Sequence, residues 1–357
     1  MPTLPPLNGR GATANARSAR FDDLARAFDG DWLDDAPAVD GDAPPLRTSV
    51  AIETPRTIIS RNASPDIPFD RSLNAYRGCE HGCIYCFARP THAYLGLSPG
   101  LDFEAKLTAK PDAARLLRAE LSKRGYVCAP LAMGTNTDPY QPIETRFGIT
   151  REVLEVLREF GHPVMITTKS DRVLRDLDIL AAMAADGLAS VVLSVTSLDP
   201  AIARTLEPRA AAPRRRLAAV AALARAGVPV LVSVSPVVPA VTDHEIEAIL
   251  AAAAEAGASG AFVRVVRLPH EVAPLFRAWL DAHHPDRAGK VMALIQSMRG
   301  GRDNDPRFGE RMRAQGPYAD MLAQRVRLAK ARFGLDRVRQ PLRTDLFAVP
   351  TAQLALL

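Results

Sequence analysis

Three of the four cysteines in this chain lie within eight residues of one another, in the stretch RGCEHGCIYCFARP over residues 77–90. Cys79, Cys83 and Cys86 have the spacing C-x3-C-x2-C. Thiolates are soft ligands that suit iron–sulfur clusters, zinc and Cu(I). A four-iron cluster on three thiolates leaves one iron with an open position, where a cofactor or substrate can bind. The loop therefore predicts a cluster that does chemistry.

Zinc is the alternative metal for this loop. Structural zinc sites usually combine one cysteine pair with a second pair or with histidines. The chain has no second pair, but His81 and His92 lie close enough in sequence to complete a Cys3His set. Cys128, the remaining cysteine, falls in an expected buried strand. A measurement of iron and acid-labile sulfide would separate the two alternatives.

The elements that must position this loop repeat about every 30 residues from residue 70 onward. Short apolar runs alternate with amphipathic stretches, and continuous apolar strands are typical of a parallel sheet covered by helices. Thr150 and Ser170 are expected to cap two of the helices. The expected strands are 72–78, 126–134, 163–168, 189–197, 229–239 and 261–269, and the expected helices are 111–125, 150–161, 170–187, 214–227 and 243–257.

Six such steps fit either a doubly wound sheet or a partial βα barrel. Polar residues follow several strands directly, in MGTNTDPYQPIE (133–144), TTKS (167–170) and LSVTS (193–197). Because βα barrels build their active sites at the carboxyl ends of the strands, this placement favours the barrel. Arg214 to Arg216 are expected on a solvated helix start, whereas Arg264 and Arg267 alternate with apolar residues and are expected to face the lumen.

The cysteine spacing after the first strand of a βα array, with Tyr85 before the third cysteine, resembles the radical S-adenosylmethionine (SAM) superfamily. The resemblance implies a partial (βα)6 TIM-like barrel with a [4Fe–4S] cluster on the three cysteines and SAM on the open iron. It also implies roles for single residues. Tyr85 would lie against the adenine and Ser194 near the ribose. Asn136, Thr137, Asp138 and, more distantly, Glu144 would lie near the SAM amino group, and Lys169 and Arg209 near its carboxylate.

Each of these polar residues also has a purely structural explanation. Asn136 to Asp138 suit an Asx turn before Pro139, and a lysine after a strand is often a solvated loop residue. A serine within a strand commonly bonds to backbone. The sequence leaves both explanations open at these positions.

The longer stretch SLNAYRGCEHGCIYCFARPTHAYLGLSPGLDFE, with TNTDPYQPIE and EPR, is similar to the spore photoproduct lyase-like or DNA repair photolyase-like branch of the superfamily. The similarity covers about residues 50–340. In spore photoproduct lyase, a cysteine just before the turn after the second strand returns a hydrogen atom. Met133 and Gly134 occupy that neighbourhood here. Repair of the spore photoproduct is therefore not the expected reaction, and the substrate is unknown, with nucleic acid as one candidate.

Charge is unevenly distributed along the 357 residues. The net charge is +5, but residues 1–50 carry five Arg and eight Asp, so the remainder is +8 by difference. A basic body can attract phosphate-rich partners, although 39 of the 45 basic residues are Arg, which points to a compositional bias. A second function class follows from this charge: a non-catalytic iron–sulfur redox sensor that binds nucleic acid.

The chain is expected to comprise a disordered tail (1–50), a radical SAM partial barrel (51–270) and a helical C-terminal extension (271–357). No apolar run is long enough to span a membrane, and no secretory signal is evident. We therefore expect a cytoplasmic monomer, reduced by an electron-transfer protein such as flavodoxin or ferredoxin.

Overall fold

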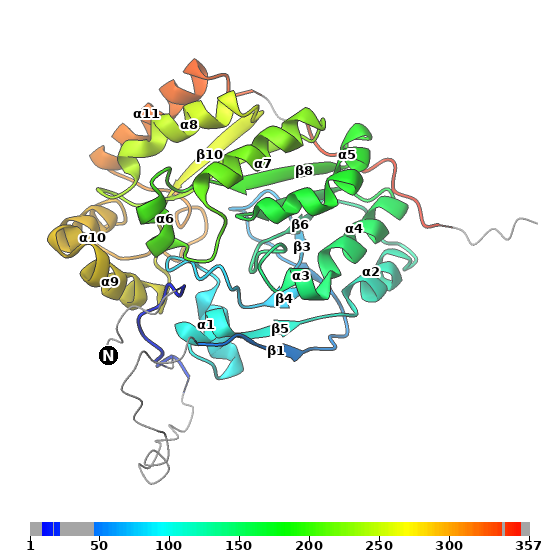
Figure 1. Ribbon diagram of the computed structural model, residues 1–357, viewed down its shortest axis with the longest axis horizontal. Coiled ribbons are helices and arrows are strands. Elements are labelled where there is room, and N and C mark those ends of the chain that lie inside the picture. Colours follow the sequence, from blue (N-terminus) through cyan, green and yellow to red (C-terminus); the bar gives the residue numbers. More distant parts are fainter. Residues whose placement is uncertain (1–8, 17, 22–45, 338–339, 351–357) are drawn as a thin grey trace, which may run out of the picture.

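The computed structural model describes residues 9–16, 18–21, 46–337 and 340–350. Its main sheet has the strand order β10-β9-β8-β7-β6-β3-β2 (Figure 1). Six of these strands run parallel in chain order, and β2 (Ile59–Arg61) pairs antiparallel with β3. This order confirms the predicted parallel (βα)6 array. The six are β3 (Arg71–Leu73), β6 (Leu131–Met133), β7 (Val164–Thr168), β8 (Ala189–Ser194), β9 (Val230–Val237) and β10 (Gly260–Val265).

Amphipathic helices cover the outer side of these strands, as Figure 1 shows. Each helix buries at least one leucine completely against the sheet, among them Leu117, Leu154 and Leu223. Burial of a leucine side chain contributes about 1.5–3 kcal/mol, so these contacts fix each helix on its strand. The helices are α2 (Ala113–Leu121), α4 (Ile149–Glu159), α5 (Leu177–Ala185), α7 (Pro213–Arg225) and α8 (Ile246–Glu255).

One of the two predicted helix caps is confirmed. Ser170 caps the 3-10 turn η3 (Asp171–Asp176), which leads into α5, by accepting a hydrogen bond from the Arg172 amide at 3.2 Å. The prediction for Thr150 was wrong. Gly148 occupies the cap of α4 with φ 66°, and the Thr150 hydroxyl donates to the Pro139 carbonyl at 2.7 Å. The local turn after the second strand therefore takes the hydroxyl that the sequence pattern assigned to the helix.

The first predicted strand divides into two. β3 stays in the main sheet, while β4 (Tyr76–Arg77) pairs with β5 (Lys106–Ala109) in a small sheet that also contains β1 (Ser49–Ile52). The small sheet lies below the barrel in Figure 1, with α1 (Leu101–Ala105) beside it. The cysteine loop leaves the barrel through β4, so this sheet supports its outer side.

The expected strand 126–134 is also shorter than predicted. Only Leu131–Met133 forms β6, and Cys128 precedes that strand in a half-buried loop. Because the cysteine loop lies at the carboxyl ends of the parallel strands, Cys128 is at the opposite end of the barrel.

Residues 10–16, here called the N-terminal strap, pack against the cysteine loop. The amides of Gly11 and Ala12 donate to the buried Glu104 carboxylate at 3.0 and 2.9 Å. A Cβ atom at Gly11 would lie 1.9 Å from the Gly82 carbonyl oxygen, within the loop itself. These residues fall in the segment expected to be a disordered tail, of which residues 22–45 lie outside the described part.

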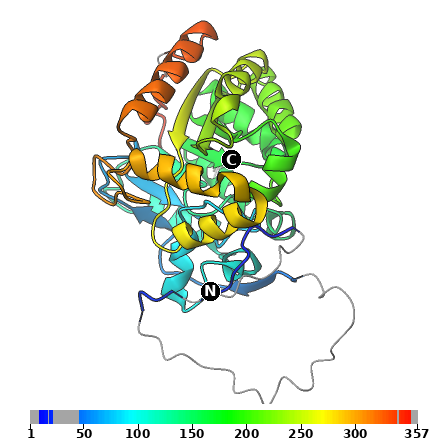
Figure 2. The ribbon, with the colours of Figure 1, turned by 90° about the vertical axis from the view of Figure 1, so that its left-hand side faces the viewer.

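The chain after β10 folds into α9 (Val272–His283), α10 (Ala288–Ser297) and α11 (Pro317–Arg332). In Figure 2, α11 (orange-red) stands apart from α9 and α10 (gold), and it packs on α8 and β10. The segment between α10 and α11 reaches the other edge of the sheet. There Arg311 pairs with Asp66, between β2 and β3, with Nε 2.6 Å from Oδ2. This segment therefore bridges the open side of the partial barrel.

Residues 340–350 have no helix or strand and run along the amino-terminal side of the barrel. Phe347 packs on Phe160 and His162, and the Ala348 amide donates to the Phe160 carbonyl at 3.0 Å. Within the ranges described, no helix is both long and apolar enough to span a membrane.

Candidate active site

The cysteine loop lies between β4 and the 3-10 helix η2 (Arg89–Leu95). Cys79 and Cys83 are buried, Cys86 is partly buried, and all three are free thiols. The loop needs glycine at its bends. Gly78 has φ 73°, and a Cβ atom there would lie 2.8 Å from the Phe103 carbonyl oxygen. The sequence thus folds the three thiols into one short, tightly backed loop.

Arg89 holds the backbone of this loop from inside the protein. It is fully buried and donates to the carbonyl oxygens of Cys83 and Gly82 at 2.9 and 3.0 Å. Its charge is balanced by Glu104, with Nη2 2.5 Å from Oε1, and the same carboxylate binds the N-terminal strap. Neither residue was predicted from the sequence. The only signal was an arginine directly after the cysteine motif, in CFARP.

The three thiols are better suited to binding a metal cluster than to acting as free nucleophiles. Burial raises the pKa of Cys83 to about 12, against the attraction of Lys169, and burial also raises the pKa of Cys79. Thiols of this kind ionise when a metal binds them. Three soft donors within one buried loop, with a cationic lysine beside them, fit the three-thiolate set of a [4Fe–4S] cluster.

Both nearby histidines have other partners. His81 Nδ1 lies 3.3 Å from Asp138 Oδ2, and His92 Nε2 lies 2.9 Å from the Lys106 carbonyl oxygen. Among the described residues, no three His, Cys, Asp or Glu side chains converge on a position for one metal ion. One ring nitrogen of each histidine is thus engaged by a protein group, while the buried His92 Nδ1 has no partner within the described residues.

Tyr85 belongs to a buried polar cluster beside the loop. Its hydroxyl donates to Glu207, and Glu207 pairs with Arg216. The Lys169 ammonium lies 5.8 Å from the centroid of the Tyr85 ring. Burial lowers the pKa of Lys169, but Cys83, Glu207 and Asp138 together raise it above its usual value. Lys169 is therefore a protonated cation that faces the thiols, as a ligand for a carboxylate must be.

Arg216 is a correction to the sequence analysis, which placed it on a solvated face. Its side chain is buried, and it donates to the Ser194 carbonyl at 3.0 Å and to the Ala211 carbonyl at 2.6 Å. The partner Glu207 lies in EPR, nine residues earlier, and the α6–α7 turn brings the two together. α6 spans Pro200–Leu206. Helix periodicity alone does not reveal such a pairing.

The turn after β6 joins the cysteine loop to the third parallel strand. Thr137 donates to the Gly78 carbonyl at 2.6 Å. Asp138 accepts hydrogen bonds from the Thr168 hydroxyl at 2.7 Å and the Lys169 amide at 2.8 Å. Burial opposes the Asp138 charge, but His81, Thr168 and the Lys169 amide lower its pKa to about 2. Asp138 thus fixes the position of Lys169.

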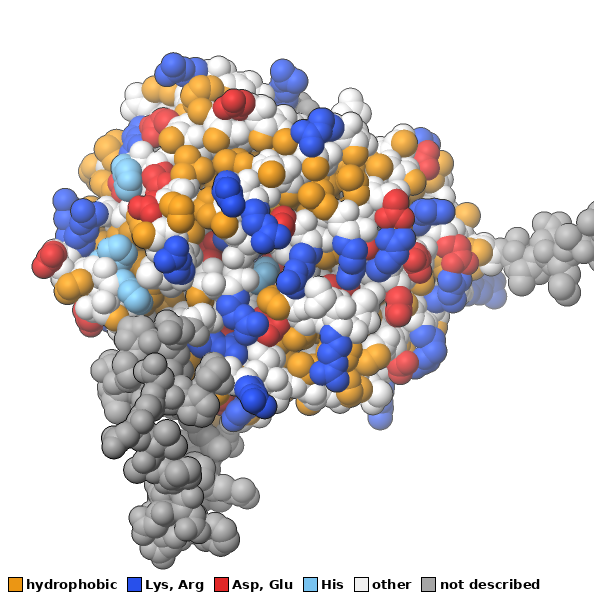
Figure 3. Space-filling view, in the orientation of Figure 1, with side chains coloured by type: hydrophobic (Ala, Val, Ile, Leu, Met, Phe, Trp, Pro, Cys, Tyr) orange, Lys and Arg blue, Asp and Glu red, His pale blue; other side chains and the backbone are white. Residues whose placement is uncertain are grey.

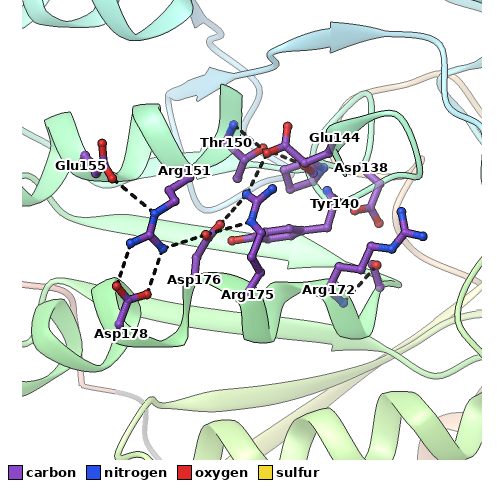
Figure 4. Close-up of polar contacts among 12 residues, drawn as sticks. Asp138, Tyr140, Glu144, Thr150, Arg151, Glu155, Arg172, Arg175, Asp176 and Asp178 are labelled. Atoms are coloured by element: carbon purple, nitrogen blue, oxygen red, sulfur yellow. Dashed lines mark hydrogen bonds and ion pairs between the residues drawn. The ribbon is translucent and has the colours of Figure 1, made fainter. Parts of the chain in front are cut away.

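Glu144 lies deeper than the sequence suggested. It is buried and accepts hydrogen bonds from the Tyr76 hydroxyl, from the Thr150 amide at 3.1 Å and from Arg175 at 2.8 Å. Figure 4 shows Glu144 within an ion-pair network that extends through Arg175 and Asp176. These contacts anchor η3, the turn that follows Lys169.

The remaining predicted residues differ in their surroundings. Arg209 pairs with Glu80 of the cysteine loop, with Nη1 3.1 Å from Oε1. Ser194 is buried at the end of β8, and Asn136 is exposed, with its amide bonded to Asn74 at 3.0 Å. Five of the predicted residues contact the loop or one another: Tyr85, Thr137, Asp138, Lys169 and Arg209. Ser194 is linked to this group through its carbonyl, which accepts a hydrogen bond from Arg216. Asn136 lies at the surface.

Two buried hydroxyl groups near these strand ends were not predicted. The hydroxyls of Thr196, after β8, and Ser235, in β9, have no hydrogen-bond partner within the described residues. Buried polar groups without partners are rare in folded proteins, so each needs an explanation, such as a bound water or ion or a functional role. Both hydroxyls are therefore further candidates for a ligand contact, after β8 and in β9.

A family model described as the radical SAM superfamily matches residues 73–253. An uncharacterized protein of Mycobacterium tuberculosis is 35% identical over 293 residues, which cover 80% of this chain and 81% of that protein. An uncharacterized protein of Methanocaldococcus jannaschii is 27% identical over 173 residues, covering 48% of this chain and 62% of its own.

Solved structures of spore photoproduct lyase share the fold. The complex with dinucleoside spore photoproduct has a TM-score of 0.55 and 16% identity, covering 80% of this chain and 79% of the lyase chain. A variant of the same enzyme has a TM-score of 0.57 with 17% identity over the same shares. At these identities the likeness concerns the fold alone.

Proposed function

This chain belongs to the radical SAM superfamily, and from that membership we propose that it is an enzyme that cleaves SAM reductively and abstracts hydrogen from a substrate. Cys79, Cys83 and Cys86 would hold the [4Fe–4S] cluster. When bound, the cluster would supply the one electron for reductive cleavage of SAM, and SAM would supply the group that abstracts hydrogen from the substrate. A reductant protein such as flavodoxin or ferredoxin would provide the electron.

The observation that carries this proposal is the cationic and polar surround of the three thiols. Lys169 lies beside the Tyr85 ring and close to the loop. A protonated lysine there would bind a carboxylate as a compact cation. Arg209 pairs with Glu80, and one-third of its side chain is exposed, so its guanidinium could bind a second anion as well. Both suit the SAM carboxylate.

The neighbouring residues would orient and shield the cofactor. Glu207 holds the Tyr85 hydroxyl, which fixes the ring on one side of the loop. Arg216 neutralises Glu207, so the pair adds no net charge near the cluster. Thr196 and Ser235 would offer their free hydroxyls to the ribose or to the substrate.

The first prediction tests the chemistry directly. Protein reconstituted without oxygen should contain about four irons with matching sulfide, and dithionite plus SAM should release 5′-deoxyadenosine. Cys83→Ala should lose the cluster, because one of three ligands is gone. Cys128→Ala is the matched control and should keep it, because Cys128 lies beyond the amino end of β6. An intact reduced cluster that never yields 5′-deoxyadenosine would exclude the enzyme proposal.

Nucleic acid is the first substrate class to test. The structurally similar spore photoproduct lyase is solved with a dinucleoside photoproduct. Figure 3 shows Lys and Arg side chains in a broken band across one face of this protein, with Asp and Glu among them. Binding through such a surface should weaken steeply with salt. Binding with an intact cluster but without 5′-deoxyadenosine formation would instead favour the redox-sensor alternative.

A further inference from the structure

A small pocket lies between the end of α10 and the segment that follows it. Its volume is about 140 Å³, well below the roughly 300–1,000 Å³ of pockets that hold whole drug-sized ligands. The pocket therefore suits a single small group. We call it the Arg299 pocket; its lining residues include Met298, Arg299, Arg302, Asp305, Arg307, Glu310 and Arg313.

Arg299 is the buried cation of this pocket. Only 6% of its surface is exposed. It donates to two neutral carbonyl oxygens, of Val266 at 2.8 Å and Arg313 at 3.5 Å. Its Nε has no hydrogen-bond partner in the described part of the chain. Burial, with the nearby charge of Arg267, lowers the pKa of Arg299 to about 10, against the attraction of Asp305, so it stays protonated at neutral pH.

The acidic residues of the pocket have other partners. Asp305 forms an ion pair with Arg307, with Oδ2 2.6 Å from Nη2, and it also accepts a hydrogen bond from the Arg307 amide at 3.0 Å. Glu310 accepts a hydrogen bond from Gln315. Four arginines against two carboxylates leave positive charge in excess. Because a buried charge without a partner is costly, the pocket would be stabilised by an anion.

The Arg299 pocket lies at the same end of the barrel as the cysteine loop. Arg299 bonds to Val266, directly after β10, and the next residue, Arg267, places its guanidinium 5.7 Å from the Phe87 ring centroid. Phe87 follows Cys86 in the chain. Arg264, which is exposed on β10, is not among the residues that line the pocket.

We propose that the Arg299 pocket binds the terminal phosphate group of a small-molecule ligand. The guanidinium presents its donors in a planar fork that matches phosphate oxygens. Nη1 and Nη2 each donate to one carbonyl oxygen, so each keeps one further N–H to donate. Arg302 and Arg313, at the rim, add charge. A terminal phosphate can enter a pocket of this size with three oxygens free to bind. A phosphodiester carries a substituent on two of its oxygens, and a pocket this small has no room for both substituents.

The test is calorimetric titration of the cluster-loaded full chain with inorganic phosphate, in chloride buffer at constant ionic strength. The expected result is saturable binding at one site. Arg302→Ser removes an exposed rim arginine and should weaken binding by about tenfold or more, the effect of one charge-assisted contact. Arg299→Gln should weaken binding at least as much. If that variant fails to fold, Arg302→Ser still decides.

Arg118→Ser is the matched control, since it removes an exposed arginine that pairs with Glu159 on the far helices. It should leave phosphate binding unchanged. No saturable binding, or an equal loss in the Arg118→Ser control, would overturn the proposal. Phenyl phosphate should compete with phosphate, and dimethyl phosphate should not; equal competition by the diester would overturn the terminal-phosphate assignment. None of these measurements needs SAM cleavage, so their outcome is independent of the proposed enzyme activity.

Discussion

At the scale of single residues, the sequence predicted the proposed ligands but not the residues that hold their loop. The three cysteines and Tyr85 lie within one motif, so spacing alone made them candidates. Arg89 and Glu104 were missed because their roles depend on contacts across the fold: Glu104 binds amides 92 and 93 residues away. Arg216 looked solvated because its partner Glu207 is not at helical spacing from it.

Lys169→Met tests the cation beside the thiols. The variant should retain the cluster, because Lys169 is not a ligand, but should bind SAM about tenfold or more weakly if one charge-assisted contact to the carboxylate is lost. The measurement is the dependence of 5′-deoxyadenosine formation on SAM concentration, which should show a raised KM. Lys123→Met, at an exposed position after α2, is the control. Equal KM values in the two variants would remove Lys169 from the SAM site.

At the scale of elements, apolar runs predicted all six parallel strands, and the polar residues that follow them favoured the barrel over a doubly wound sheet. The runs are continuous because helices cover the sheet, and such runs can be recognised in the sequence without any knowledge of tertiary contacts. The split of the first strand into β3 and β4 was not predictable, because β4 finds its partner in β5, about 30 residues later. The N-terminal strap was not predicted either. Its composition is typical of a disordered tail, and its partner Glu104 lies far away in the sequence.

Gly11→Ala tests the strap. The new Cβ would meet the Gly82 carbonyl oxygen at 1.9 Å, so the strap must shift and its bonds to Glu104 must weaken. We expect faster amide hydrogen exchange in residues 10–16 and 82–86 and faster loss of the reconstituted cluster in air. Gly289→Ala is the matched control, because nothing lies within 4 Å of its Cβ position. Identical exchange in both variants would show that the strap does not support the loop.

At the scale of the whole molecule, the two ends of the sheet are joined by segments far apart in the chain. Arg311 reaches Asp66 across the open side, and residues 340–350 run along the amino-terminal side. Neither segment has a periodic pattern of its own. The sequence therefore predicted the helices of the C-terminal extension but not the position of these two segments. Their positions follow from what the barrel leaves uncovered.

His162 links this packing to pH. It is fully buried beneath Phe347, and it is neutral: Nδ1 bonds to the Pro163 carbonyl and Nε2 to the Tyr126 hydroxyl. Burial, opposed by the hydrogen bond to the Pro163 carbonyl and assisted by the charge of Arg71, lowers the pKa of His162 from 6.5 to about 4. In the unfolded chain His162 takes up a proton near pH 6.5, but in the folded chain only near pH 4.

Stability should therefore be complete above pH 6.5 and fall by on the order of 3 kcal/mol as the pH drops to about 4. His162→Gln should flatten this slope in urea unfolding between pH 7 and 4, whereas His244→Gln, at an exposed position, should not. A slope unchanged in His162→Gln would assign the acid sensitivity to another group.

The strap also fixes an order of events during synthesis. The strap residues leave the ribosome before the residue that they bind, because Glu104 follows 93 residues after Gly11. At about 5–20 residues per second, the strap waits on the order of five to twenty seconds for Glu104. Throughout that interval the outer side of the cysteine loop is uncovered. The strap therefore closes over the loop only after the chain has been made through Glu104.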